Sequence, residues 1–393
     1  MKYFFVSVLA TALISPIAYG QNDANDIVPN VVPRVLPESR MWRQPIYKNQ
    51  DKTLGYSSKA FATPKGMEKQ VQFWVDVYGK YTSEQGILHD SENIDKIYQI
   101  VDLKGLKTDR EKQKKIDQVK EEIADKLKLS KEARSNLRFQ LGQKDRMQQA
   151  IFYSGRYIED MEDIFREAKL PIELVRLVYV ESSFNINARS KVGASGMWQI
   201  MPYTAKPYRM ISSSVDKRNH PMDATRFAAR LLRSNYNMLD SWPLAVTGYN
   251  HGPTGVSKMT KSYKSRDLAY LVDNVASRRS FGFASRNFYA CFLAVLEVEK
   301  NANTYFGGVL WAKPFESQDL KLPKPIKYRE LVKWFDGDHQ KAQVFNPHLT
   351  HAVIKKGFAI PSKTVISLPK DKYNVALISL ASKGRTIASE KTN

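Results

Sequence analysis

Residues 171–181 read PIELVRLVYVE, and this stretch decides both the fold and the chemistry expected of the chain. Leu174, Leu177 and Val178 recur at helical spacing, and the proline at the start suits a first helical turn. Glu181 continues that apolar face. A carboxyl group that faces a core loses water, which raises its pKa and keeps it protonated near neutral pH, as a general acid requires. The pattern alone leaves two interpretations of Glu181 open, a helix-end or salt-bridged glutamate, which is the commoner case, and a catalytic acid.

A second informative stretch, residues 193–202, reads GASGMWQIMP. Its two glycines permit close backbone approach. Ser195 and Gln199 offer hydrogen bonds, while Met197 and Trp198 offer apolar surface. This mixture suits a sugar-binding groove, although a glycine turn beside a core tryptophan explains the same residues.

A third stretch, residues 242–252, reads WPLAVTGYNHG and is typical of a short helix that ends on glycine. Tyr249 and Asn250 lie at the end of this helix. Either side chain could orient a carboxylate, and a simple capped helix end is the alternative.

The hydrophobic periodicity along the rest of the chain favours helices. Residues 222–239 and 287–299 have the pattern of amphipathic helices, and alternating strand patterns are scarce. The spacing of apolar residues over 71–101 predicts short helices, and the charged run at 104–134 predicts a solvated helix. We therefore expect a mainly α fold, with a short stretch after Pro314 that mixes helix-like and β-like pieces.

The N-terminus has the features of a cleavable export signal. An apolar run covers residues 4–17 and is followed by the small-residue pattern Ala18-Tyr19-Gly20. This run is shorter than the roughly 20 residues that span a bilayer, so a membrane anchor is the less favoured alternative. We expect the mature chain to work in the periplasm or to be secreted. The only cysteine, Cys291, lies far from the signal and allows neither a lipid anchor there nor an internal disulfide.

The three stretches together resemble the motifs of a known enzyme family. Glu181-Ser182, then residues 193–202, then Gly248-Tyr-Asn occur in the order and spacing of the lytic transglycosylases with the goose-type lysozyme fold, the SLT domain family. The resemblance covers roughly residues 141–305, and the flanking stretches resemble membrane-bound members. Residues 345–349, followed by Ile360-Pro361, resemble one degenerate LysM-type glycan-binding repeat.

This resemblance implies how one carboxyl group can suffice. Ordinary glycosidases need two, one of them to form a covalent intermediate or to activate water. In the family a single glutamic acid cleaves the β-1,4 bond between MurNAc and GlcNAc of peptidoglycan and leaves 1,6-anhydro-MurNAc. The resemblance assigns this role to Glu181. It assigns substrate contacts to Ser182, Ser195, Met197, Gln199, Tyr249 and Asn250.

Two departures from the family pattern leave other functions open. Gly248 stands where alanine is common, and Ala284 stands where many members have a glutamate, with Arg286 or Asn287 as substitutes. The alternatives are a hydrolytic muramidase, in which Asp216 would position water, and a peptidoglycan-binding protein without activity.

The formal net charge of +21 indicates an anionic partner. Behind an export signal, peptidoglycan carboxylates or membrane phosphates fit better than nucleic acid, which we do not expect as a partner. A basic surface that only maintains solubility is the alternative. We expect a monomer with peripheral attachment to envelope surfaces. We expect no cofactor and no metal, because the six histidines are scattered.

The chain of 393 residues has room for several folded units. The predicted organisation is a signal peptide at 1–20, an extended linker at 21–70, a helical N-terminal region at 71–140, the lysozyme-like SLT domain at 141–310, a LysM-like module at 320–370 and a tail at 371–393.

Overall fold

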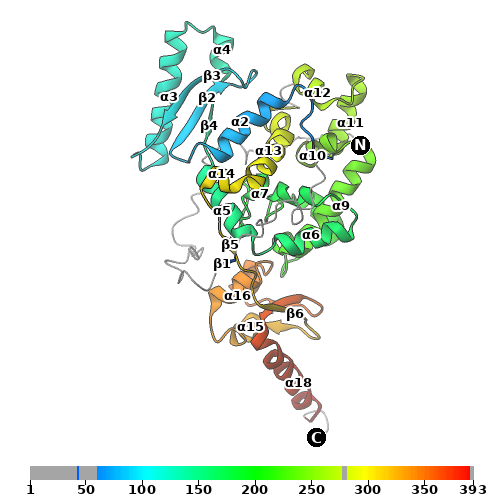
Figure 1. Cartoon of the computed structure of the whole chain (residues 1–393). Helices are drawn as coiled ribbons and strands as arrows, with labels where there is room; N and C mark the ends of the chain where they lie inside the picture. The colour runs from blue at the N-terminus through cyan, green and yellow to red at the C-terminus, as the bar shows by residue number, and fades with distance from the viewer. Residues whose placement is uncertain (1–41, 44–59, 277–280, 390–393) are drawn as a thin grey trace.

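A computed structural model of the chain describes residues 42–43, 60–276 and 281–389 (Figure 1). The predicted signal peptide at 1–20 and most of the predicted linker at 21–70 lie outside these residues. A short part of that linker is described as strand β1 (Trp42–Arg43), which pairs antiparallel with β5 (Trp311–Ala312). The mainly α fold class is confirmed, since helices make up most of the described chain and the strands are few and short.

The N-terminal region is not helical throughout, so that part of the prediction is wrong. It contains α2 (Glu68–Gly79), then an antiparallel sheet in the order β3-β2-β4, with α3 and α4 between β3 and β4. Their bounds are Gln85–Asp90 for β2, Ile97–Asp102 for β3, Asp109–Lys126 for α3, Lys131–Ser135 for α4 and Leu137–Leu141 for β4.

The error has a physical reason. Ile94, Ile97, Tyr98 and Val101 are spaced as on a helix, but a run this short has no reliable period of its own. Hydrogen bonding to β2 and packing against α3 decide its conformation. The solvated helix predicted within 104–134 is confirmed as α3, whose Thr108 and Glu111 form a capping box.

The central part of the chain is a helical domain whose core surrounds α13 (Phe283–Lys300), a helix buried along most of its length. Helices α2, α7 (Leu177–Ser182) and α10 all pack against α13. The remaining helices of this part are α5 (Lys144–Ser154), α6 (Ile158–Glu167), α8 (Pro202–Ala205), α9 (Pro221–Leu239), α10 (Trp242–His251), α11 (Pro253–Ser262), α12 (Leu268–Asn274) and α14 (Ala302–Phe306).

The main core extends beyond residues 141–310, because α2 contributes to it. Trp74 of α2 donates a hydrogen bond through Nε1 to Oδ1 of Asn287 at 3.0 Å, and both side chains are buried. The small sheet has a separate core, built around Leu88, Val119 and Phe139, against α3. In Figure 1 this sheet and the C-terminal module lie at opposite ends of the central domain.

The C-terminal module is α+β, as predicted, and has its own hydrophobic core. Strands β6 and β9 pair antiparallel, as do β7 and β8. The predicted tail at 371–393 contains helix α18 (Tyr373–Ser389). The module's elements are β6 (Ser317–Lys321), β7 (Ile326–Lys327), α15 (Tyr328–Lys333), α16 (His339–Phe345), α17 (His351–Ile354), β8 (Ala359–Ile360), β9 (Val365–Pro369) and α18 (Tyr373–Ser389).

A loop of the central domain docks the C-terminal module. Val215 pairs with Leu349 in a β-bridge, and its side chain enters the module's core. Next to it, His220 and His348 meet edge to face with ring centroids 4.9 Å apart, and both are buried. The two units are therefore joined by backbone pairing and by packing. Among the residues that the structure describes, we find no helix with the length and apolar character needed to cross a bilayer.

Candidate active site

Glu181 lies on a helix that is enclosed on all sides. The predicted single helix begins as a 3-10 turn, η4 (Ile172–Arg176), and continues as α7 (Leu177–Ser182), with Pro171 just before it. Every residue from 172 to 180 is buried, so the predicted apolar face is one side of a wholly buried helix. The helix ends where Ser183 adopts the left-handed conformation, at φ 53°. Glu181 is thus carried on the last turn before the chain returns to the surface.

A buried ion network fixes the orientation of this helix. The Arg176 side chain donates through Nε to Oε2 of Glu299 at 2.7 Å and also bonds to Glu162. The Tyr179 hydroxyl donates to Oε1 of Glu299 at 2.8 Å. Removing one partner of such a network leaves an uncompensated buried charge, which typically costs about 3–5 kcal/mol. The network therefore ties α7 to α6 and α13 and holds Glu181 in place.

The surroundings of Glu181 favour its protonated form. Its side chain is partly exposed, yet burial raises the pKa of its carboxyl group to about 8. Within the described residues its carboxyl oxygens have neither a hydrogen bond nor an ion pair that would offset this. Burial also raises the pKa of Tyr249 well above its usual value, and the nearby charge of Glu181 raises it further. The Glu181 carboxyl group and the Tyr249 phenol are therefore near enough for the charge of one to act on the other.

The loop at 193–200 is locked in a conformation that requires glycine. Gly196 has φ 77°, and a Cβ on it would lie 2.0 Å from the carbonyl oxygen of Arg218. Trp198 stacks on Phe165 at 5.8 Å and donates through Nε1 to Thr225 at 2.9 Å. The close backbone approach predicted for the glycines is therefore made by Gly196, to the backbone at Arg218.

Four of the predicted substrate-binding residues hold this region together in the described structure. Ser195 is buried and donates to Oδ1 of Asn219 at 2.6 Å. Gln199 donates through Nε2 to the carbonyls of Ala188 and Gly196. Ser182 donates to the Val178 carbonyl, and Met197 is buried in the core. Of the four only Gln199 is partly exposed, and a role for each in binding substrate stays a prediction.

Tyr249 and Asn250 lie on the last turn of α10. The Tyr249 hydroxyl donates to the carbonyl of Trp198 at 2.9 Å, which joins α10 to the loop at 193–200. Oδ1 of Asn250 accepts a hydrogen bond from Ser285 at 2.9 Å. Nδ1 of His251 lies 3.3 Å from the same serine oxygen. The structure therefore brings Tyr249 of α10 together with the loop at 193–200, near Glu181. It also adds His251 and Ser285, which the sequence analysis did not identify as site residues.

These two residues, His251 and Ser285, form a short relay to Asn250. Burial lowers the pKa of His251, so the ring is neutral and Nδ1–H can donate to the serine. The serine then donates to Oδ1 of Asn250, which leaves the amide NH₂ of Asn250 as a donor. The sequence could have pointed to these two residues only by their positions, because His251 directly follows the Gly-Tyr-Asn motif and Ser285 directly follows Ala284.

The residues suggested as substitutes for a second glutamate already have structural partners. Ala284 is buried in the core. Arg286 donates through Nε to the Phe281 carbonyl at 2.8 Å. Asn287 accepts the hydrogen bond from Trp74 and donates to the Phe283 carbonyl. Both polar side chains thus serve to join α13 to its neighbours.

Asp216, the carboxylate that a hydrolase would need, is held by Arg218. Nε and one terminal nitrogen of Arg218 lie 2.9 and 2.7 Å from the two oxygens of Asp216. The other terminal nitrogen of Arg218 donates to the carbonyls of Gly193 and Ile200. This paired carboxylate braces the loop at 193–200.

Cys291 and the histidines offer no evident centre for other chemistry. Burial raises the pKa of the Cys291 thiol well above its usual value, so it remains an unreactive thiol. Over the described ranges, no three residues of the types His, Cys, Asp and Glu gather into a group that could hold a metal ion.

Part of the chain is similar to known proteins. Residues 164–272 match the Transglycosylase SLT domain. The chain is 27% identical over 186 residues to membrane-bound lytic murein transglycosylase D from two strains of Escherichia coli, covering 46% of this chain and 40% of each relative. A protein of an Alteromonas species, named for tributyltin chloride resistance, is 34% identical over 99 residues, which are 25% of this chain and 48% of that protein.

The match to these relatives is partial, since this chain spans less than half of their length. The matched segment nevertheless contains Glu181, the loop at 193–200 and the Gly-Tyr-Asn motif. Residues 164–272 of this chain are therefore similar to the SLT domain of lytic transglycosylases.

Proposed function

We propose that this chain is a peptidoglycan lytic transglycosylase that cleaves the β-1,4 bond between MurNAc and GlcNAc and leaves a 1,6-anhydro-MurNAc end. The observation that carries the proposal is Glu181, a carboxyl group without a partner in the described residues, whose pKa is raised to about 8 inside an SLT domain. Such a group is protonated at neutral pH and can give its proton to a leaving oxygen.

The proposed reaction uses the same carboxyl group twice. Glu181 donates its proton to the glycosidic oxygen, the bond from that oxygen to the anomeric carbon of MurNAc breaks, and GlcNAc leaves as the alcohol. The resulting carboxylate then accepts the proton of the C6 hydroxyl as its oxygen bonds to the anomeric carbon. No water is consumed, and Glu181 ends protonated. In this proposal, Tyr249 and the amide NH₂ of Asn250 hold the sugar and the carboxylate; the bonds from Tyr249 to Trp198 and from Ser285 to Asn250 support it by fixing both side chains.

The alternative functions have weaker support. A hydrolase needs a second carboxylate to activate water, and Asp216 is already paired with Arg218. A protein that only binds glycan has no need to keep Glu181 at a raised pKa without a compensating partner. We therefore favour the transglycosylase over both.

The cellular setting is part of the proposal. The relatives from Escherichia coli are named membrane-bound, which agrees with work in the cell envelope. We place the chain in the periplasm or outside the cell, as a monomer acting on peptidoglycan, with its positive charge drawing it to anionic wall polymers. The C-terminal module is proposed to bind glycan in the manner of LysM repeats.

Mass spectrometry of the soluble products tests the proposal. Purified sacculi are incubated with the purified chain and, in parallel, with the Glu181→Gln variant. Anhydro-ended fragments from the unmodified chain alone are the expected result. Fragments heavier by one water would identify a hydrolase, and sacculus binding without release of fragments would identify a binding protein. Either result would overturn the proposal.

A further inference from the structure

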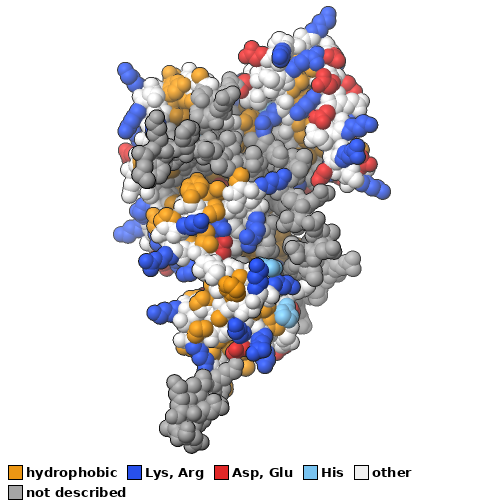
Figure 2. Space-filling view, turned by 180° about the vertical axis from the view of Figure 1, so that it is seen from behind, with side chains coloured by type: hydrophobic (Ala, Val, Ile, Leu, Met, Phe, Trp, Pro, Cys, Tyr) orange, Lys and Arg blue, Asp and Glu red, His pale blue; other side chains and the backbone are white. Residues whose placement is uncertain are grey.

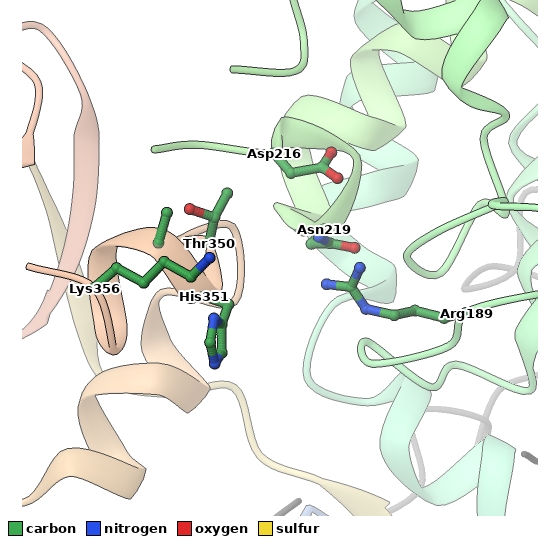
Figure 3. A pocket seen from close by; sticks show the side chains of 7 residues that line it. Arg189, Asp216, Asn219, Thr350, His351 and Lys356 are labelled. Atoms are coloured by element: carbon green, nitrogen blue, oxygen red, sulfur yellow. The ribbon is translucent and has the colours of Figure 1, made fainter. Parts of the chain in front are cut away.

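A cavity of about 510 Å³ lies between the central domain and the C-terminal module. Figure 3 shows side chains from both units pointing into it. The residues that matter here are Arg189, Asp216 and Asn219 from the central domain and Thr350, His351 and Lys356 from the module. A volume of this size accommodates a small molecule or one arm of a polymer.

Backbone hydrogen bonds fix the walls of this interdomain cavity. The amide of Asp216 donates to the His348 carbonyl at 2.8 Å, and the amide of Thr350 donates to the Ser214 carbonyl at 3.1 Å. The Thr350 hydroxyl donates to the Ser213 carbonyl at 2.6 Å. The cavity is therefore a consequence of how the two units are joined.

The cavity has an excess of positive charge. Its one acidic lining residue, Asp216, is neutralised by Arg218. Arg189 and Lys356 reach into the space from opposite sides, and neither has an ion pair with any described residue (Figure 3). Two unpaired cations that face each other across a cavity favour an oxyanion between them. The same basic character extends over the surface, since Lys and Arg outnumber Asp and Glu on the module's face in Figure 2.

The cavity adjoins the proposed substrate groove. Arg189 forms a β-bridge with Ser195, and the hydroxyl of that serine bonds to Asn219 on the cavity wall. The carbonyl of Ala188, the residue before Arg189, accepts a hydrogen bond from Gln199. One short segment thus borders both the cavity and the loop at 193–200.

We propose that this interdomain cavity binds a free carboxylate of the peptides that the glycan strand carries. This inference rests on the proposed function and deepens it, because it names peptide-bearing glycan as the preferred substrate. A carboxylate is the anion that these peptides supply, and Arg189 and Lys356 are the two cations that face it in the cavity. The planar Arg189 guanidinium can bond both carboxylate oxygens at once.

Calorimetric titration of the full chain carrying Glu181→Gln measures binding without turnover. The probes are a GlcNAc–MurNAc oligomer with free peptide carboxylates, the same oligomer with amidated carboxylates, a peptide-free oligomer and inorganic phosphate. We expect amidation or removal of the peptides to weaken binding about fivefold, in the range of a partly exposed ion pair. Arg189→Gln and Lys356→Gln should abolish that difference.

Two neighbouring cations supply matched controls. Lys191 and Lys355 are exposed and lie close in sequence to the two cavity residues, but they do not line the cavity. Lys191→Gln and Lys355→Gln should therefore keep the fivefold preference, which separates a local contact from a general effect of net charge.

The inference is overturned if all three oligomers bind equally, if the control variants lose the preference as well, or if phosphate competes as strongly as the peptide carboxylates. Product analysis with sacculi is a separate readout. Absence of anhydro products there would overturn the proposed function, whereas loss of the peptide preference in binding would overturn only the present inference.

Discussion

Two carboxyl groups of the central domain, Glu181 and Asp216, have opposite surroundings. Asp216 accepts hydrogen bonds from the backbone amide and two side-chain nitrogens of Arg218. Glu181 lies at the end of a buried helix and accepts none from the described residues, so burial alone sets its pKa at about 8. Burial raises the pKa of Glu181 because no cation among the described residues offsets it, whereas Asp216 lies against the Arg218 guanidinium.

We expect the largest effect on activity when the carboxyl group of Glu181 is removed. Glu181→Gln should reduce the rate of anhydro product formation by about 10²–10⁴-fold, the usual contribution of a general acid–base group. Stability should not fall, because an amide replaces a carboxyl group that is costly to ionise in this position. Rates from sacculi and thermal unfolding of the same preparation measure both quantities.

Asp216→Asn is the matched comparison for that variant. It removes the charge that holds Arg218 but no proton needed in the reaction. We expect the products to remain anhydro-ended and stability to fall by about 1.5–3 kcal/mol, as for a lost hydrogen bond to a charged group. An activity loss as large as that of Glu181→Gln would show that the two carboxyl groups act as a pair.

The next prediction concerns the stability that the buried network of Arg176, Glu162 and Glu299 provides. Arg176→Met removes the arginine that bonds to Glu299 and one of the two arginines that bond to Glu162, and we expect it to lower the free energy of unfolding by about 3–5 kcal/mol. Arg166 pairs with the same Glu162 at the surface, so Arg166→Met should cost less than about 1 kcal/mol. Denaturant unfolding of the two variants provides the measurement. Equal losses would contradict a special role for the buried network.

A smaller effect appears in the pH dependence of stability. The pKa of Glu181 rises from 4.5 to about 8 on folding, so between these values the folded chain holds a proton that the unfolded chain has lost. Stability from this group is therefore lost as the pH rises through that window. Unfolding temperatures measured from pH 5 to pH 9 should show Glu181→Gln gaining on the unmodified chain. Parallel curves would mean that Glu181 ionises normally.

The histidine pair between the two units, His220 and His348, should make stability depend on pH in the opposite direction. Burial lowers the pKa of His348 to about 3 and also lowers that of His220, so both are neutral when folded. The stability that depends on them is lost as the pH falls below about 6.5, where the unfolded side chains take up protons. Acid should therefore weaken the docking of the C-terminal module.

The parts that the sequence predicted well are those in which local pattern and final environment agree. The periodic stretches at 222–239 and 287–299 became α9 and α13, and the charged run became α3. Strand β3 was missed because its six residues depend on pairing with β2. Where the period was short, partners distant in sequence decided the structure.

At the candidate site, too, local motifs could be predicted from the sequence and contacts between distant residues could not. Glu181 and Tyr249 lie within local motifs, and the structure brings them together. The contacts that were missed join residues far apart in the chain, such as Arg176 with Glu299 at a separation of 123 residues and Asn250 with Ser285 at 35. No local period encodes such pairs.

The smallest predicted effect tests the relay to Asn250. Ser285→Ala removes the hydroxyl that bonds to Oδ1 of Asn250, so the amide is free to turn and its NH₂ no longer points consistently toward the substrate. We expect kcat/KM to fall about fivefold, the equivalent of one ordinary hydrogen bond, with most of the loss in kcat. Ser285→Thr keeps the hydroxyl and should restore activity. If the threonine variant is as impaired as the alanine variant, Ser285 acts through packing, and the orientation of Asn250 is set by other contacts.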